Sequence, residues 1–335
     1  MGVLKNYVIP RLGIYVLEIF IGCTISFLIP RFTPIDPVQA VINRYAAFGE
    51  FYDPEIVENL IDTLKELYGL KGTLLEQYIG FLKRIIVGDF GPSLTAFPTP
   101  VTEIIWRALP WTIGLLSIAT ILAWIIGNIV GGIAGYFYEE KWAKALAGFA
   151  TVIRPVPYYI IALLLVLLFA YVFPIFPMGG GVTMGTKPSL TLRFLLDLLK
   201  HAFLPALSLI LTQYSVQFII MRSLVINTRT KDYVVFGEAM GLPKSKLLFK
   251  YVLRNSLLPQ VTGLAIMLGS IFNGALVTEL VFSYPGIGTI LYTAITTGDF
   301  NLMMGIVTYS IIAVATAALL IDLLYPLVDP RIRYR

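Results

Sequence analysis

The feature that most constrains the fold is a set of six long apolar stretches. They cover about residues 12–29, 109–137, 147–173, 204–226, 257–282 and 302–327. A bilayer core roughly 30 Å thick is crossed by about 20 apolar residues in an α-helix. Only helices and closed barrels satisfy their backbone hydrogen bonds in lipid, and these stretches lack the alternation of strands. We therefore expect an all-α integral membrane protein with six transmembrane helices.

The composition supports a membrane protein. Charged residues make up 13% of the chain and hydrophobic residues 57%, whereas a soluble domain is about 25% charged. The single cysteine, Cys23, excludes an intramolecular disulfide, and with the single histidine, His201, it argues against a metal site. No small-residue cleavage site is obvious near the N-terminus, so we read the first apolar stretch as a retained span.

The distribution of charge predicts the orientation. Residues 227–256 hold six basic and two acidic residues, and the C-terminal tail carries three arginines. Residues 32–108 hold ten acidic and six basic residues. Because Lys and Arg accumulate on the cytoplasmic side, we expect a multi-pass protein of the inner (cytoplasmic) membrane with both termini in the cytoplasm.

This orientation divides the chain into four parts. We expect a cytoplasmic N-terminus and first helix, an extracytoplasmic domain, a five-helix core and a cytoplasmic tail. Their boundaries are 1–31, 32–108, 109–328 and 329–335, with the cytoplasmic loop 227–256 inside the core.

The extracytoplasmic segment has the signals of a small helical domain. Asp53 and Pro54 suit the start of a helix, and Gly69 suits its end. Thr73 and Glu76 have the spacing of a capping box at the start of a second helix. Such a domain is either a structural cover or a docking surface for a partner outside the cell.

The loop sequence GEAMGLPKSKLLFKYVLRNSLLP, residues 237–259, predicts two helices joined by a tight turn. A short helix over 232–240 ends where Gly241 adopts a left-handed conformation, and Pro243 fits the first turn of the next helix. The apolar face of that second helix consists of Leu247, Leu248, Tyr251 and Val252. The alternative is an interfacial amphipathic helix that its lysines hold to anionic lipid.

Several fragments resemble a known family. They are PIDPVQAV, QYIGFLKRIIVGDFGPSL, DYVVFGEAMGLPKSKLLFKYVLRNSLLP, ELVFSYPGIG and DLLYPLVDPRIRY. Their order and spacing are similar to those of permease subunits of the oligopeptide/dipeptide (peptide/nickel-type) family of binding-protein-dependent ABC importers. The resemblance covers nearly the whole chain and implies the type I ABC importer permease fold.

The resemblance also implies a set of partners and a coupling site. The partners are a second homologous permease subunit, two ATP-binding subunits, an extracytoplasmic solute-binding protein and membrane lipid, with no nucleic acid. ATP and Mg²⁺ would bind to the partner subunits, so no cofactor and no catalytic residue is expected in this chain. The ATPase-coupling loop would comprise Asp232, Tyr233, Phe236, Glu238, Ala239, Gly241, Leu242 and Pro243.

Two sequence features qualify this interpretation. The wider importer class has Glu-Ala-Ala where this chain has Val235, Phe236 and Gly237, so Glu238 is not the glutamate of that class. The chain also lacks G-x-x-x-x-G-K-[ST], so it has no loop of its own to hold ATP phosphates. The contact with an ATPase would therefore be built from other residues, including the apolar Phe236.

Polar residues within the spans are candidates for a translocation path. Gln213 and Gln217 lie four residues apart, on one face of a helix. Asn273 and Glu279 are the other two candidates. The alternative is that these side chains join neighbouring helices, a contribution of ~0.6 kcal/mol on average.

The function that these features favour is transport, without enzymatic activity in this chain. We expect a permease subunit that forms half of a path for peptides or oligosaccharides. A secondary transporter driven by an ion gradient is the alternative, but it would leave the basic loop unexplained and the chain shows no clear repeat. An intramembrane hydrolase is disfavoured because His201 is poorly placed to serve as a base.

Overall fold

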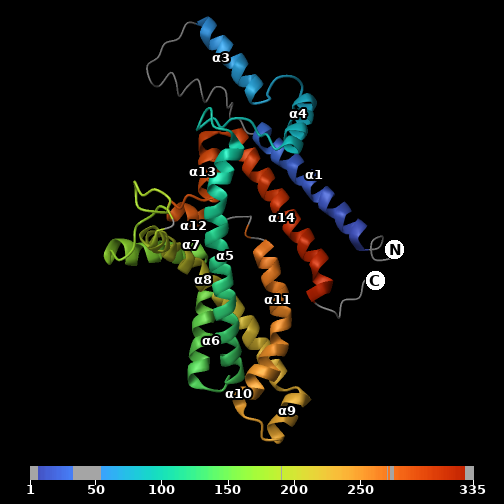
Figure 1. The fold of residues 1–335 in the computed structure, drawn as a ribbon, viewed down its shortest axis with the longest axis vertical. Helices are drawn as coiled ribbons and strands as arrows, with labels where there is room; N and C mark the ends of the chain where they lie inside the picture. The colour runs from blue at the N-terminus through green and yellow to red at the C-terminus, as the bar shows by residue number, and fades with distance from the viewer. Residues whose placement is uncertain (1–6, 33–53, 190, 270, 272–274, 329–335) are drawn as a thin grey trace. The chain divides into compact units, whose positions relative to one another are not determined.

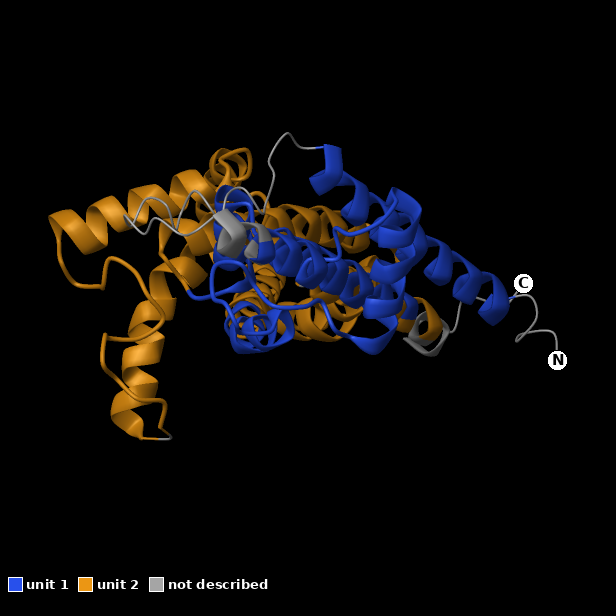
Figure 2. Ribbon diagram, turned by 90° about the horizontal axis from the view of Figure 1, so that it is seen from above, with its two compact units in different colours: residues 1–112, 285–319 blue, residues 113–284, 320–335 orange. Residues whose placement is uncertain are grey.

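The computed structural model describes residues 7–32, 54–189, 191–269, 271 and 275–328, and for 54–58, 60 and 324–328 it describes the backbone alone. Within these ranges the chain is α-helical and contains no strand, apart from an isolated bridge between Pro92 and Pro100. The chain divides into two compact units (Figure 2). Unit 1 comprises residues 1–112 and 285–319, and unit 2 comprises 113–284 and 320–335.

Among the helices that the structure describes, four are long and apolar enough to cross a membrane. They are α1 (Ile9–Phe32), α5 (Val101–Tyr136), α8 (Leu192–Arg229) and α14 (Phe300–Val328) (Figure 1). They correspond to the first, second, fourth and sixth predicted spans. The expected multi-pass membrane protein is therefore confirmed.

The third predicted span is broken. The expectation of one helix over 147–173 is corrected to a pair, α6 (Lys141–Ile153) and α7 (Tyr158–Val166), with α7 continued by the π-helical turn η2 (Leu167–Val172). The two parts are bent by 98°. Pro155 and Pro157 lie at the bend, because proline lacks the N–H of a helical hydrogen bond and disfavours helix in the preceding residue.

The fifth predicted span, 257–282, is divided between α11 (Arg254–Gly269) and α12 (Leu276–Val281). Residues 270 and 272–274, which would join them, lie outside the described residues. The described helices thus provide four spans, or five if the bent pair is counted as one. A total of six spans stays a prediction.

Unit 1 is built on the pair α1 and α14, which lie side by side (Figure 1). The Tyr15 hydroxyl lies 3.0 Å from the hydroxyl of Thr316. Phe27 of α1 is buried with Phe81 and Met304, so that α4 packs over the ends of both helices. This unit also contains α3 (Pro54–Leu67), α4 (Leu74–Val87) and α13 (Ile287–Thr297).

The predicted helix caps of the segment 32–108 are confirmed where the structure describes them. Gly69 has a φ of +62°, the left-handed conformation expected after α3. At the start of α4 the Thr73 hydroxyl accepts a hydrogen bond from the Glu76 amide, and the Glu76 carboxylate accepts one from the Thr73 amide. Asp53, the predicted cap of α3, lies outside the described residues.

A buried carboxylate joins the start of α14 to the loop before α5. Asp299 is fully buried, and one carboxylate oxygen accepts hydrogen bonds from the Ser93 hydroxyl at 2.5 Å and the Thr95 amide at 3.0 Å. The other oxygen accepts from the Leu302 amide at 3.1 Å, which caps α14. The only acid in the connection 283–301 is therefore a structural residue within unit 1.

Unit 2 is held together by a close approach of α5 and α8. A Cβ atom on Gly131 would lie 2.5 Å from the Phe218 carbonyl oxygen, and one on Gly135 would lie 2.8 Å from that of Arg222. Gly127 occupies the same stripe one turn earlier, against Gln217. Small residues at this four-residue spacing let membrane helices pack backbone to backbone.

Candidate functional site

The loop between α8 and α11 forms the predicted elbow of two helical segments. It consists of α9 (Asp232–Ala239), a turn at Gly241, and α10 (Lys244–Lys246) continued by the π-helical segment η3 (Leu247–Leu253). Gly241 has a φ of +74°, as expected. The turn is closed by a hydrogen bond of 3.1 Å from the Leu242 amide to the Gly237 carbonyl. Pro243 is the N-cap residue, one position before the first turn in which it was expected.

The inner side of the elbow is anchored in a buried apolar cluster. Val234 of α9 is fully buried together with Leu247, Leu248 and Val252 of η3. The cluster continues into the ends of α8 and α5 through Met221, Val225 and Tyr136. A displacement of α9 would therefore displace the ends of two membrane helices. A flexible loop would not transmit such a movement.

Gly237 explains part of the departure from the Glu-Ala-Ala pattern. It is buried, and a Cβ atom there would lie 2.8 Å from a methyl carbon of Leu247 and 3.3 Å from one of Leu242. An alanine would require these side chains to shift. The absence of a side chain lets α9 lie close to η3.

The outer side of α9 exposes large apolar side chains. Tyr233 is 45% exposed, Phe236 68% and Met240 65%. Tyr233 and Phe236 lie one turn apart on α9, and Met240, its C-cap residue, follows at i+7 on the same side. Exposed apolar groups gathered on one surface are typical of a contact site for another protein. We call these three residues the elbow face.

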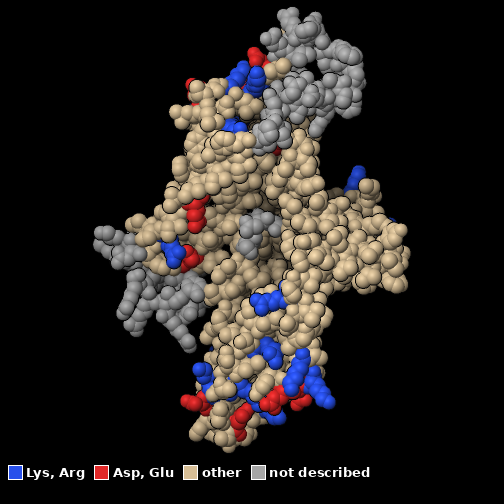
Figure 3. Space-filling view, turned by 180° about the vertical axis from the view of Figure 1, so that it is seen from behind, with Lys and Arg blue, Asp and Glu red and all other residues tan. Residues whose placement is uncertain are grey.

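Charged side chains surround the elbow face. Figure 3 shows charged side chains gathered at the elbow end of unit 2. The rest of that unit's surface is largely uncharged in the same view. The basic residues of the second arm and the first residue of α11 are all exposed: Lys244, Lys246, Lys250 and Arg254. Asp232 and Glu238 are exposed on α9. An apolar face with a charged rim is the usual anatomy of a protein interface.

The predicted path residues have different surroundings. Gln217 is 5% exposed, and its amide nitrogen lies 2.9 Å from the Met267 sulfur on α11. The amide oxygens of Gln213 and Gln217 are buried and have no hydrogen-bond partner among the described residues. Glu279 in α12 is fully buried. Asn273 lies outside the described residues.

These surroundings leave the translocation path a prediction. Gln217 contacts α11. The described hydrogen bonds include none between Glu279 and either glutamine. Among the described residues, no group of three His, Cys, Asp or Glu side chains is arranged to hold a metal ion. The elbow is thus the best-formed candidate site.

Two contributors to this region were missed in the sequence. Met240 completes the elbow face, and its spacing from Tyr233 and Phe236 would have revealed it. The stripe of Gly127, Gly131 and Gly135 lets α5 pack against α8, and its four-residue repeat is visible in the sequence GNIVGGIAG. In both cases the helical period was the available signal.

Comparison with known proteins gives a consistent result. The family model described as "Binding-protein-dependent transport system inner membrane component" matches residues 127–334. The chain is 30% identical to the oligopeptide transport system permease protein AppB of Bacillus subtilis, over 98% of this chain and 99% of that protein. It is 27% identical to the dipeptide transport system permease protein DppB of Lactococcus lactis, with 98% and 99% covered. It is also 28% identical to the oligopeptide transport system permease protein OppB of Salmonella typhimurium, with 94% and 95% covered.

Proposed function

The chain belongs to the family of binding-protein-dependent transport system inner membrane components, and we propose that it forms half of an ATP-driven path for peptides. Its family consists of transport permease subunits and not of enzymes. The relatives are named for oligopeptide and dipeptide transport. These names favour peptides over the oligosaccharides that the sequence also allowed.

The elbow face is the observation that carries the coupling part of this proposal. An exposed apolar stripe on an eight-residue helix would dock into a groove on a separate ATP-hydrolysing subunit. ATP and Mg²⁺ would be held by two such subunits, because this chain has no phosphate-binding loop. A second permease subunit would complete the path in the membrane.

The mechanism follows from how the elbow is anchored. Movement of the ATPase subunits would push on Tyr233, Phe236 and Met240. The buried cluster under α9 would pass that displacement to the ends of α8 and α5, because closely packed side chains transmit strain. A shift of these helices would alternate access to the path, and nucleotide binding would set which state is populated.

The segment 32–108 would dock the solute-binding protein on the other side of the membrane. This placement requires both termini in the cytoplasm. The excess of acids over bases in this segment would steer a partner with a basic surface, within about 8 Å at physiological salt. Crosslinkers attached at Lys65 and Lys83, which are exposed on α3 and α4, should capture the binding protein, whereas the Glu58 side chain lies outside the described residues.

The coupling proposal can be tested with a matched pair of phenylalanines. The chain would be reconstituted in nanodiscs with its partner subunits, and ATPase activity measured with and without peptide-loaded binding protein. Phe236→Ala should abolish most of the stimulation, because truncating a central apolar anchor costs about 2 kcal/mol or more. Phe249→Ala removes a ring from the second arm that is 59% exposed, against 68% for Phe236, and should leave the stimulation nearly unchanged.

Two results would contradict parts of this proposal. Equal stimulation in the wild type and the Phe236→Ala variant would show that α9 does not contact the ATPase. Stimulation by an oligosaccharide-loaded binding protein, with none by a peptide-loaded one, would replace peptides as the cargo.

A further inference from the structure

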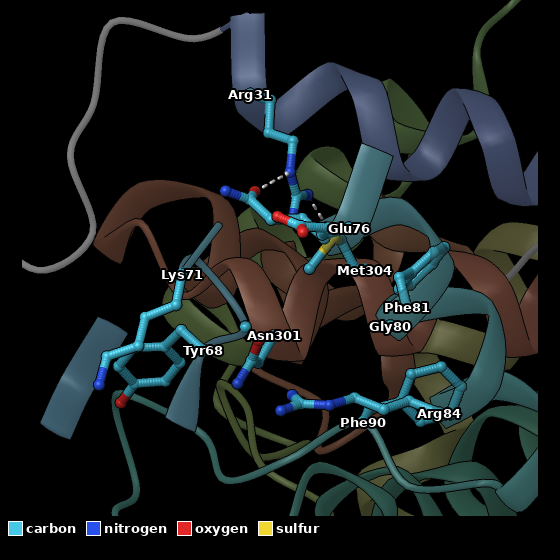
Figure 4. A pocket seen from close by; sticks show the side chains of 12 residues that line it. Arg31, Tyr68, Lys71, Glu76, Gly80, Phe81, Arg84, Phe90, Asn301 and Met304 are labelled. Carbon is cyan, nitrogen blue, oxygen red and sulfur yellow. Dashed lines mark hydrogen bonds between the residues drawn. The ribbon is translucent and has the colours of Figure 1, made fainter. Parts of the chain in front are cut away.

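A cavity of about 130 Å³ lies within unit 1. It is lined mainly by α4, together with the end of α1, the connection between α3 and α4, and the start of α14. Figure 4 shows the guanidinium groups of Arg31 and Arg84 on opposite sides of it, with Tyr68 and Lys71 along a third side. A water molecule needs about 10–15 Å³ of such space, so the cavity accommodates a group of several heavy atoms.

The lining has an excess of positive charge. It contains Arg31, Lys71 and Arg84, and one acid, Glu76. The Glu76 carboxylate accepts hydrogen bonds from the amide and the hydroxyl of Thr73, at 2.7 and 3.0 Å. The one acid of the lining is therefore already engaged in the helix cap.

The two arginines are held by neutral acceptors. The Arg31 Nε donates to the Gln77 amide oxygen at 3.1 Å, and its Nη1 donates to the Phe27 carbonyl at 3.0 Å. The Arg84 Nη1 donates to the Leu67 carbonyl at 3.2 Å. Among the ion pairs of the described side chains, neither arginine takes part. Both side chains are half-buried, so their charges are partly removed from water, and the described acidic side chains supply no ion pair to either.

Glycines shape the cavity around these charges. A Cβ atom on Gly91 would lie 3.3 Å from the Arg84 guanidinium and one on Gly69 would lie 3.7 Å from it, so backbone packs closely beside that group. Gly80 lines the cavity on α4, and a Cβ atom there would meet nothing within 4 Å. The space is therefore open at Gly80, whereas the Arg84 guanidinium, one turn further along α4, is closely packed.

The cavity lies where a membrane helix ends. Arg31 is in the last turn of α1, whose apolar side chains, including Leu17, Phe20 and Ile29, are exposed along the span. Beside the cavity, α4 exposes a second apolar stripe that includes Leu75 and Ile86, 66% and 85% exposed. A helix with one apolar and one charged face is typical of the membrane interface.

We propose that this cavity binds the phosphate of a phospholipid headgroup, with Arg31 and Arg84 as its ligands. Guanidinium groups match phosphate oxygens in geometry and charge. The exposed stripe of α4 and the sides of α1 would contact the acyl chains of the same lipid. The inference rests on α1 as a membrane helix and not on the coupling or the cargo proposed above.

The test uses the purified full-length chain in a neutral detergent and three soluble probes. These are dihexanoyl phosphatidylglycerol, inorganic phosphate and dihexanoyl glycerol, which lacks the phosphate. Binding is measured by native mass spectrometry and by calorimetry. The lipid should bind, inorganic phosphate should bind more weakly and compete with it, and the uncharged diacylglycerol should not compete.

Variants assign the binding to the cavity. Arg31→Gln should weaken lipid binding about tenfold or more, because a charge-assisted hydrogen-bond pair is lost. Gly80→Leu fills the cavity without changing its charge and should have the same effect. Lys83→Gln removes an exposed cation of the same helix that does not line the cavity, and should leave the affinity within about twofold. Thermal unfolding of each variant confirms that it is folded.

Three outcomes would overturn the proposal. Equal affinity for inorganic phosphate and the lipid would show a free-phosphate site and remove the lipid from the proposal. Unchanged lipid binding in both folded cavity variants would place the lipid elsewhere. If the lipid does not bind, and Arg31→Gln instead weakens the complex with the binding protein, the arginine serves a protein contact.

Discussion

The Arg229 Nη1 donates a hydrogen bond of 2.9 Å to the backbone carbonyl of Tyr136, and its guanidinium carbon lies 5.2 Å from the Tyr136 ring centroid. Arg229 is the last residue of α8 and Tyr136 the last of α5. The contact therefore joins the two helices at the point from which the elbow projects. Because a helix C-terminus carries partial negative charge, a cation is favourable there.

We predict that Arg229→Gln loosens the base of the elbow. Loss of a hydrogen bond from a charged donor costs about 1.5–3 kcal/mol. Peptide-stimulated ATPase activity of the reconstituted complex should fall, while membrane insertion of the chain stays normal. Lys231→Gln removes an exposed cation two residues later and is the matched control. Equal activity of the two variants would show that the contact does not support coupling.

The glycine stripe of α5 leads to a prediction about stability. Gly131→Ala places a methyl group 2.5 Å from the Phe218 carbonyl oxygen, so α5 and α8 must separate. We expect a loss of about 1–3 kcal/mol, the usual cost of overpacking. The measurement is the thermal unfolding of the detergent-solubilised chain.

Gly114→Ala is the control on the same helix. A Cβ atom there would meet nothing within 4 Å, so the change should be neutral or should stabilise the helix by about 0.5–1 kcal/mol. If both alanine variants unfold at the same temperature, the stripe does not set the distance between the helices.

The path assignment of Gln217 can be tested with a thiol. In a Cys23→Ser background, a Gln217→Cys side chain should react slowly with a small polar reagent, because the position is almost fully buried against α11. If α8 and α11 separate during transport, the reaction should accelerate when ATP is trapped on the partner subunits. A Lys200→Cys variant, exposed on α8 outside the predicted span 204–226, should react at the same rate in both states. A Gln217→Cys thiol that stays inert in each state would make the glutamine a contact between helices.

The stability of the first turn of α4 should depend on pH. Hydrogen bonds from the Thr73 amide and hydroxyl hold the pKa of the Glu76 carboxyl below its ordinary value. Because the folded-state pKa is lowered, the carboxylate stabilises the helix fully above the ordinary glutamate pKa of about 4.3. That contribution is lost as the pH falls through the folded-state pKa.

Hydrogen exchange across residues 73–87 measures this effect. Protection of the first turn of α4, relative to the same segment in Glu76→Gln, should decrease with falling pH below about 4.3. The Glu76→Gln variant has no carboxyl to titrate there and should show no such step. A step of the same size in both proteins would assign the pH dependence to other groups.

The sequence by itself determined features that depend on near neighbours. The hydropathy of long stretches located α1, α5, α8 and α14, because length and apolarity suffice to define a span. The capping box at Thr73 and the left-handed turn at Gly241 followed from residues at most three positions away. In these cases the backbone conformation is fixed within about one helical turn.

Only the tertiary structure decided which distant residues meet. The sequence predicted one span over 147–173, whereas the structure bends it by 98° at Pro155 and Pro157, with α6 and α7 each packed on α8. Asp299 is bound by Ser93, 206 residues away, and Arg31 and Arg84 share one cavity. The hydropathy pattern does not predict which helices are neighbours, because an apolar helix face can pack equally well against lipid and against protein. The partners of a polar side chain are chosen by packing, which brings together residues that no local pattern relates.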